Sequence, residues 1–256
     1  MYHFFVEPQA IDLAGHRVFI SGEDVRHIKN VLRMRAGEEI SVSDRETARE
    51  YRCLIKELGD EVIECSLCFV KEADTELPTK IYLFQGLPKA DKLEMVIQKA
   101  VELGAYSIVP VSCHRSVVKL DEKKAAKKQE RWQQISEAAA KQSKRALVPV
   151  VERPVSFREA MEFAGEKCAL KLLPYELSDP SAMEETRKLI NSVKAGGSIG
   201  IFIGPEGGFE DEEIELAKKM GFEIITLGRR ILRTETAGMT VLSWLMLQLE
   251  GLEADE

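Results

Sequence analysis

The chain has 256 residues, of which 45% are hydrophobic and 31% charged, and its formal net charge is −7. This composition is typical of a globular protein, and the length suits one large domain or two modest ones. No run of about 18 apolar residues predicts a membrane-spanning helix, and the N-terminus lacks the basic start and the length of a signal peptide. Five cysteines at irregular spacing predict no disulfide framework. We therefore expect a cytoplasmic protein with no membrane partner.

The first 70 residues show a strand-rich pattern of β-branched and aromatic residues between turn residues. The predicted strands cover residues 4–6, 17–20, 39–42, 51–55 and 62–70. Val25, Ile28 and Leu32 recur at helical spacing and predict one helix over residues 23–32. Cys65 and Cys68 are the only pair with metal-like spacing, but they lie in a strand pattern without a second pair, so we expect no metal. Residues 1–72 are thus predicted to form a small β-barrel with a basic helix, followed by a polar linker over 73–79.

From residue 80 onward, strand and helix patterns alternate. The predicted strands cover residues 81–84, 107–111, 147–151, 168–173, 199–203 and 223–227. The predicted helices cover residues 92–103, 122–145, 157–164, 183–193, 211–220 and 236–249. Ser156 and Glu159 form a capping-box signature for the third of these helices. This alternation predicts a mostly parallel sheet covered on both faces, so residues 80–256 are expected to form an α/β domain.

A glycine-rich loop follows the predicted strand at 199–203, with the sequence Gly204-Pro205-Glu206-Gly207-Gly208-Phe209. Glycine allows close approach of the backbone to a ligand. The loop has no Walker lysine, the first strand lacks the dinucleotide fingerprint, and the next helix begins with four acids. The loop therefore favours an adenosine-like ligand without phosphates, and the alternative is a plain tight turn.

A second loop follows the predicted strand at 223–227 and carries Arg229, Arg230 and Arg233 just before Glu235. Ligands of open α/β sheets bind at the carboxyl ends of the strands, so the two loops predict one composite site. Arginine suits phosphate or carboxylate, and Glu235 can accept a proton, orient a substrate N–H or simply cap the helix. The apolar stripe of that last helix predicts core or a subunit interface.

Basic residues are concentrated locally despite the acidic net charge. Residues 26–35 contain Arg26, Lys29, Arg33 and Arg35 without an acid, and residues 115–131 contain seven Lys or Arg against three acids. Binding to a phosphate backbone needs local cation density. The alternative for either run is a solvated helix face.

Both loops, with shorter matches upstream, resemble the bacterial ribosomal RNA small subunit methyltransferase E family, of the SPOUT class of S-adenosylmethionine enzymes. The matching residues are Gly204 to Gly208, Leu227, Gly228, Arg230, Leu232, Arg233, Glu235 to Ala237, Val31 to Arg33, Lys89, Lys92, Gln98, Lys99, Glu102 to Gly104, Arg115, Ser116, Ala139, Gln142, Ser143 and Arg145. The resemblance implies a PUA-like N-terminal domain and a SPOUT domain with a trefoil knot. It also implies a homodimer that methylates N3 of one uridine of 16S rRNA in the 30S subunit, with S-adenosyl-L-methionine as the cofactor.

Roles for individual residues follow from combining the loops with this resemblance. The expected cofactor-binding residues are Gly204, Glu206, Gly207, Leu227, Gly228, Ile231, Leu232, Thr236 and Ala237. Glu235 is the candidate base, with Arg233 or Arg230 stabilising negative charge on uracil. The expected RNA-binding residues are Arg26, Lys29, Arg33, Arg35, Lys89, Lys92, Arg115 and Arg145.

The chain departs from the family pattern at His3, where the family often has Arg, which leaves the role of that position open. Two alternative functions also remain open. One is a non-enzymatic RNA-binding or ribosome-assembly factor, and the other is a SPOUT enzyme that acts on ribose 2′-OH or on transfer RNA.

Overall fold

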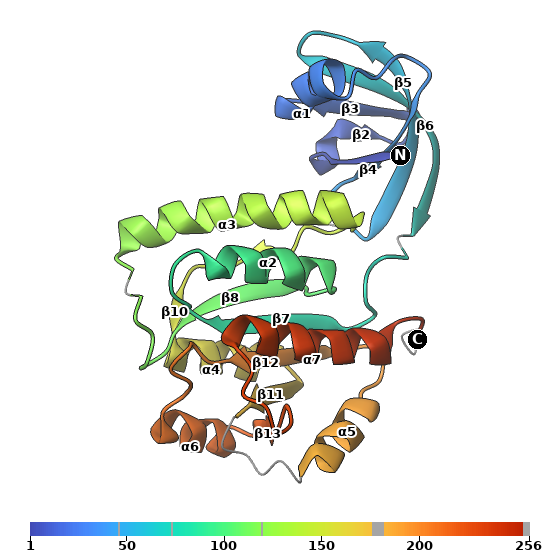
Figure 1. Cartoon of the computed structure of the whole chain (residues 1–256). Coiled ribbons are helices and arrows are strands. Elements are labelled where there is room, and N and C mark those ends of the chain that lie inside the picture. Colours follow the sequence, from blue (N-terminus) through green and yellow to red (C-terminus); the bar gives the residue numbers. More distant parts are fainter. Residues whose placement is uncertain (46, 73, 119, 176–181, 253–256) are drawn as a thin grey trace. The chain divides into compact units, whose positions relative to one another are not determined.

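The computed structural model describes residues 1–45, 47–72, 74–118, 120–175 and 182–252 (Figure 1). The chain divides into two compact units. The N-terminal unit comprises Met1–Glu76 together with Ala140–Val148, and the C-terminal unit comprises Leu77–Ala139 and Pro149–Glu256. A short segment from the middle of the chain therefore belongs to the first unit.

The N-terminal unit is a curled six-stranded sheet around its own apolar core. The strand order is β1 (Tyr2–Phe5), β4 (Glu39–Ser43), β5 (Arg49–Leu58), β6 (Val62–Glu72), β3 (Arg17–Ser21) and β2 (Ile11–Asp12), with a 3-10 turn η1 (Pro8–Ala10) before β2. The pairing of β1 with β4 is parallel and the others are antiparallel. The predicted PUA-like sheet is thus confirmed as a curled half-barrel.

The predicted helix of this unit is also present, as α1 (Glu23–Arg26) continued by the π-helical turn η2 (His27–Val31). Val25 and Ile28 are buried in the core, which explains their helical spacing in the sequence. In β6, Cys65 is fully buried and Cys68 is exposed, as expected for residues three apart on a strand. Burial raises the pKa of the Cys65 thiol to about 12, so this cysteine behaves as an apolar core residue.

His3 lies in β1, and its Nδ1 is 2.9 Å from the hydroxyl of Ser41. Burial lowers the pKa of His3 to about 4. The imidazole is therefore neutral at neutral pH. His3 does not supply the permanent positive charge that arginine would bring to the same position.

The C-terminal unit is built on a seven-stranded sheet in which every described pairing is parallel, as predicted. The order is β10 (Val155–Ser156), β8 (Ser107–Ser112), β7 (Lys80–Gly86), β12 (Ser198–Ile203), β11 (Leu170–Pro174) and β13 (Glu223–Ile225), and β9 (Val150–Val151) also pairs with β8. The helices are α2 (Lys92–Glu102), α3 (Glu122–Ser143), α4 (Phe157–Lys167), α5 (Met183–Asn191), α6 (Asp211–Lys219) and α7 (Thr234–Leu249).

Helices cover both faces of this sheet, which accounts for the nearly continuous apolar strands. Residues of α4 and α6 pack with Phe84 and Phe202 on one face. On the other face, α7 packs against β12, β7 and α2 (Figure 1). The predicted capping box of α4 is present, with Ser156 and Glu159 bonded in both directions. Helix α3 ends two residues earlier than predicted, and the next residue, Lys144, adopts a left-handed backbone with φ 60°.

Strand order determines where the two loops meet. Strand β12 lies between β7 and β11, and β13 lies on the far side of β11. Because these strands are parallel, their carboxyl ends share one edge of the sheet, and the loops after β12 and β13 leave from it. The trefoil knot implied by the resemblance stays a prediction. Within the described ranges, no helix is both long and apolar enough to cross a membrane.

Candidate active site

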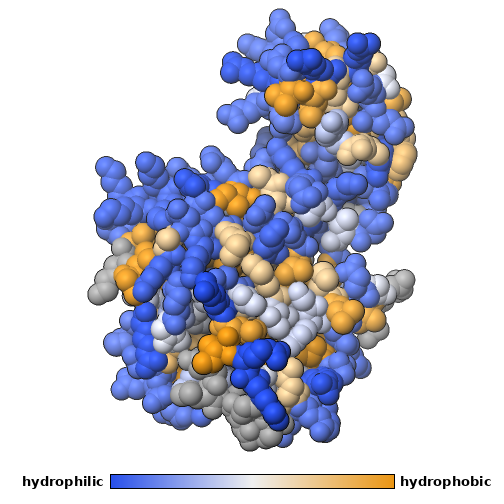
Figure 2. All heavy atoms as spheres, viewed as in Figure 1, coloured by the Kyte–Doolittle hydropathy of each residue, from blue (hydrophilic) through white to orange (hydrophobic). Residues whose placement is uncertain are grey.

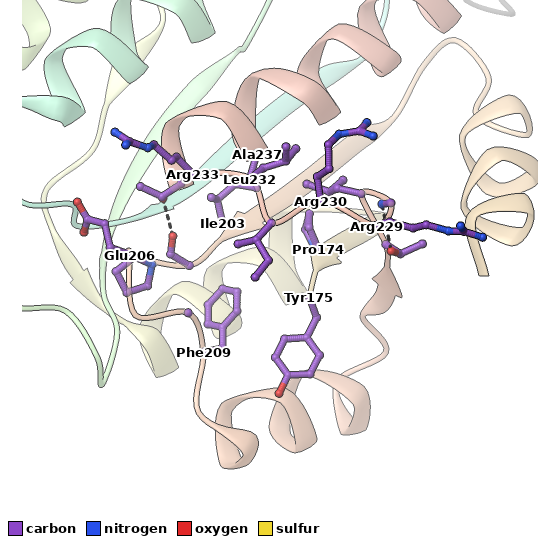
Figure 3. A pocket seen from close by; sticks show the side chains of 18 of the residues that line it. Pro174, Tyr175, Ile203, Glu206, Phe209, Arg229, Arg230, Leu232, Arg233 and Ala237 are labelled. Atoms are coloured by element: carbon purple, nitrogen blue, oxygen red, sulfur yellow. Dashed lines mark hydrogen bonds between the residues drawn. The ribbon is translucent and has the colours of Figure 1, made fainter. Parts of the chain in front are cut away.

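A cavity of about 430 Å³ opens at this edge of the sheet, lined by both loops and by the end of β11 (Figure 3). Most of the residues predicted for the cofactor line it: Gly204, Glu206, Leu227, Gly228, Ile231, Leu232 and Ala237. Arg230 and Arg233 line it as well, whereas Gly207 and Thr236 are not part of the lining. The composite site predicted from the two loops is therefore formed by the fold.

The glycine-rich loop lies directly on the end of β7. A Cβ atom on Gly86 would lie 2.6 Å from the backbone nitrogen of Pro205, so only glycine allows this contact. A Cβ atom on Gly204 would lie 3.3 Å from the backbone of Gly208 and from the ring of Phe209. The close packing fixes the path of the loop along the cavity.

The same loop is held by hydrogen bonds and ion pairs from two other segments. The carboxylate of Glu206 accepts a hydrogen bond from the backbone N–H of Lys89 at 3.1 Å and one from Nζ of Lys92 at 3.0 Å. On the opposite side, Arg115 donates to the carbonyl oxygen of Gly207 at 3.0 Å and to Glu210 at 2.8 Å. The Arg115 hydrogen bond lowers the pKa of the Glu210 carboxyl, which therefore stays ionised at neutral pH.

Thr234, the first residue of α7, connects the second loop to the first. Its hydroxyl donates to the carbonyl oxygen of Gly204 at 2.6 Å and accepts from the side-chain amide of Gln85 at 2.8 Å. Gln85 is fully buried in β7. Hydrogen bonds buried in this way fix the start of α7 relative to the sheet.

The second loop leaves its charged side chains exposed. Arg229, Arg230 and Arg233 are exposed and form no ion pair within the described part of the chain, and Ile231 is 86% exposed. In Figure 3 the side chains of Arg233 and Arg229 point away from each other, and Arg229 extends toward α5. These guanidiniums are available to an anion or to a polar substrate.

Glu235 lies in the first turn of α7, beside the cavity lining. The residue is only 9% exposed, and its Oε2 atom makes no hydrogen bond. Its nearest charged partner is Lys92, whose Nζ lies 3.6 Å from Oε2. The simple capping role weighed for Glu235 is not observed, since no side chain caps the start of α7 by a hydrogen bond. A buried carboxylate without a hydrogen-bond donor is an acceptor suited to a substrate N–H.

The structure gives the predicted RNA-binding residues different surroundings. Arg26, Arg33, Arg35 and Lys89 are exposed, and Lys29 is half-buried and bonded to Gly59 and Asp60. Lys92 and Arg115 instead brace the glycine-rich loop. Arg145 is 3% exposed and pairs with Glu76 within the N-terminal unit. This burial favours a structural role for Arg145.

Sequence reasoning missed part of the cavity wall, namely Pro174 and Tyr175 at the end of β11, Thr226 at the end of β13, and Phe209. Tyr175 donates from its hydroxyl to Asp211 at 3.1 Å. No motif marks the end of β11, but its position between β12 and β13 places it between the two loops. These residues could have been predicted only from the order of the strands in the sheet.

Comparison with known proteins identifies the class of protein that this fold and site define. Residues 75–246 match the RNA methyltransferase domain family, and residues 20–68 match the RNA methyltransferase PUA domain family. The chain is therefore an RNA methyltransferase-type protein with a PUA domain.

Relatives narrow this class to one family. The chain is 38% identical to ribosomal RNA small subunit methyltransferase E of Bacillus subtilis over the whole of both chains, and 30% identical to the protein of that name from Synechocystis over 98% of this chain and 78% of that one. A crystal structure of the Neisseria gonorrhoeae ribosomal RNA small subunit methyltransferase E bound to S-adenosyl methionine superposes with a TM-score of 0.80 at 31% identity, covering 96% of this chain and 97% of that one. This chain belongs to the ribosomal RNA small subunit methyltransferase E family.

Proposed function

We propose that this protein transfers a methyl group from S-adenosyl-L-methionine to N3 of a uridine in 16S rRNA of the small ribosomal subunit. Family membership supports this activity. The observation that carries it is the buried Glu235 carboxylate, whose Oε2 atom has no hydrogen-bond donor and which lies beside a cavity lined by glycine backbone, apolar side chains and exposed arginines.

The cavity suits S-adenosyl-L-methionine in size and chemistry. A volume of about 430 Å³ is within the range of cofactor sites, and the lining combines glycine backbone with Ile203, Leu227 and Leu232. The cofactor carries no phosphate, which agrees with a loop that has no phosphate-binding lysine motif. Gly204, Leu227, Gly228, Ile231, Leu232 and Ala237 would hold it through backbone and apolar contacts, and when bound it supplies an electrophilic methyl group. Glu206, Gly207 and Thr236 contribute less directly, since Glu206 is bonded to Lys92 and the other two lie outside the lining.

The proposed chemistry at Glu235 follows from the structure of uracil. N3 of uridine carries a proton, and its electron pair becomes available as this proton leaves. The carboxylate of Glu235 accepts the proton, and Arg233 or Arg230 stabilises the negative charge that develops on the uracil oxygens. Both arginines are exposed and line the cavity, so they can reach a base held at its mouth.

RNA binding is assigned to exposed cations in both units. In the N-terminal unit these are Arg26, Arg33 and Arg35, with residues 1–72 as the proposed RNA-binding domain. In the proposed catalytic domain, residues 80–256, Lys89 is exposed next to the glycine-rich loop. Binding that depends on phosphate contacts weakens steeply as salt is raised.

A homodimer is the proposed assembly. Hydrophobic and weakly polar side chains gather over α7, with hydrophilic side chains beside them (Figure 2). Leu247 of α7 is 80% exposed, and a groove of about 330 Å³ lies between α5 and α7, lined by Ile190 and Trp244 among others. Exposed apolar surface of this kind commonly marks an interface between chains. A monomeric mass by light scattering at micromolar concentration would contradict this assembly.

The substitution Glu235→Gln tests the catalytic assignment. We expect turnover to fall by about 100-fold or more while the cofactor dissociation constant changes by less than about threefold, because the amide cannot accept the proton. Glu212→Gln, in the exposed first turn of α6, is the matched control. Single-turnover assays on 30S subunits and calorimetry with the cofactor supply the two measurements. Unchanged single-turnover rates would remove Glu235 from the role of base.

The nature of the product separates the proposed function from its alternatives. Mass spectrometry of 16S rRNA from a deletion strain, before and after complementation, is expected to show the loss and return of one 3-methyluridine. A missing 2′-O-methyl group, or a change confined to transfer RNA, would identify a different SPOUT activity. No cofactor binding by calorimetry would instead favour a non-enzymatic RNA-binding factor.

A further inference from the structure

Lys92 lies between two carboxylates from different segments of the chain. Its Nζ is 3.0 Å from Oε1 of Glu206 in the glycine-rich loop and 3.6 Å from Oε2 of Glu235 at the start of α7. The lysine itself comes from the first turn of α2. One ammonium group thus connects three segments that are far apart in the sequence.

Only one of the two contacts is a hydrogen bond. Glu206 accepts from Lys92 directly, whereas Oε2 of Glu235 has the positive charge nearby but no donor. The ammonium therefore lies beside Oε2 of Glu235 and leaves that oxygen free to accept a proton or an N–H from a substrate. A direct hydrogen bond from the lysine would occupy the acceptor that the proposed base needs.

The other charged groups near this position do not replace Lys92. Glu206, from the glycine-rich loop, carries the same sign as Glu235, and Lys92 lies between the two carboxylates. Arg233 is the other cation near Lys92, but it is exposed and makes no ion pair with Glu235 in the described structure. The pKa of Lys92 is raised chiefly by its hydrogen bond to Glu206, so the ammonium keeps its charge across the physiological range.

We propose that Lys92 is a positioning residue for the methyl transfer, which holds the Glu235 carboxylate in place and ties it to the glycine-rich loop through Glu206. The inference rests on the proposed role of Glu235 as base. It also gives Lys92 a role other than the RNA contact expected from the sequence.

The test compares Lys92→Met and Lys92→Arg in single-turnover assays on 30S subunits at saturating cofactor, with RNA affinity measured alongside by filter binding. Loss of the ammonium leaves the Glu235 carboxylate without its positioning contact, so we expect the rate of Lys92→Met to fall by about tenfold or more while its RNA affinity changes by less than about threefold. Lys92→Arg keeps the charge and is expected to recover most of the rate. Lys188→Met, which removes a partner of an exposed ion pair with Glu184 on α5, is the matched control and should change neither value.

A second readout separates positioning of Glu235 from a purely structural role. In the Glu235→Gln background, Lys92→Met should cost little further rate, because both substitutions act through the same carboxylate. An equal loss of rate from Lys92→Met in both backgrounds would overturn the proposal. A change confined to RNA affinity and its salt dependence would also overturn it, in favour of a phosphate contact. If Glu235→Gln retains full turnover, the proposed base fails, whereas rate losses that simply add would overturn only the role of Lys92.

Discussion

The loops after β12 and β13 line the same cavity, yet their charged residues are used in opposite ways. In the first loop, Glu206 is bonded to α2, and Arg115 donates to Gly207 from the segment after β8. In the second loop, the three arginines are exposed and unpaired within the described chain. One loop is fixed before any ligand arrives, and the other keeps its charges available.

Local composition explains this difference. The first loop and the helix after it are rich in acids, which find cations on neighbouring elements. The second loop contains arginines and no acid until Glu235. A fixed backbone suits a cofactor that is gripped through main-chain contacts, and unpaired guanidiniums suit charge that develops only during a reaction. The site is thus divided into a loop proposed for cofactor binding and a loop proposed for catalysis.

Among substitutions that test the difference between the two loops, the largest effect is expected when a free cation of the second loop is removed. Arg233→Met should lower the single-turnover rate by about 100-fold at saturating cofactor, since negative charge on uracil loses a stabilising donor. The cofactor dissociation constant, measured by calorimetry, should stay within about threefold of the wild-type value because no contact to the first loop is lost. Arg158→Met, on the exposed side of α4, is the control. A large loss of cofactor affinity in Arg233→Met would contradict the division between the loops.

A smaller effect on catalysis, but a large one on binding, is expected from crowding the first loop. Gly86→Ala places a methyl group 2.6 Å from the Pro205 backbone, and such overpacking costs about 1–3 kcal/mol. We expect a lower melting temperature and a cofactor affinity weaker by about tenfold or more, because the loop must move away from β7. Gly165→Ala in α4 meets no atom within 4 Å and serves as the control. Wild-type cofactor affinity in Gly86→Ala would show that the loop path is not fixed by this contact.

The smallest effect is expected from Arg115, which braces the first loop from outside the cavity. Arg115→Met removes donors to Gly207 and Glu210. Because the position is exposed, we expect cofactor affinity to fall by no more than about fivefold, which is what solvent-exposed ionic contacts contribute. RNA affinity of the cofactor-free protein, measured by filter binding with Arg158→Met alongside, should not change. The reverse pattern would return Arg115 to the RNA-binding role expected from its sequence.

Most of the architecture followed from local sequence patterns. Alternating strand and helix patterns predicted the parallel sheet of the C-terminal unit, and the capping box at Ser156 marked the start of α4. The missing phosphate motifs also limited the ligand of the glycine-rich loop. Patterns of this kind depend on residues close together in the chain, so they can be read without knowing the fold.

The partners of the basic residues could not be predicted in this way. Lys92 is hydrogen-bonded to Glu206, which lies more than a hundred residues later in the chain. Arg115 is bonded to Gly207 and Glu210, which are almost as distant in the sequence. Arg145 is buried and paired with Glu76. A sequence shows that a side chain carries positive charge, but the strand order determines whether a carboxylate lies within reach. Lys92 and Arg115, both expected at the RNA surface, therefore brace the glycine-rich loop.

By itself, the sequence determined the chemical character of the two loops and the order of strands and helices, because both depend on neighbouring residues. Only the tertiary structure decided that Glu235 is buried without a hydrogen-bond donor, that Lys92 stands between it and Glu206, and that β11 completes the cavity wall. The physical reason is that parallel strands distant in the chain bring their carboxyl ends to one edge, and contacts across that edge depend on the pairing of the strands.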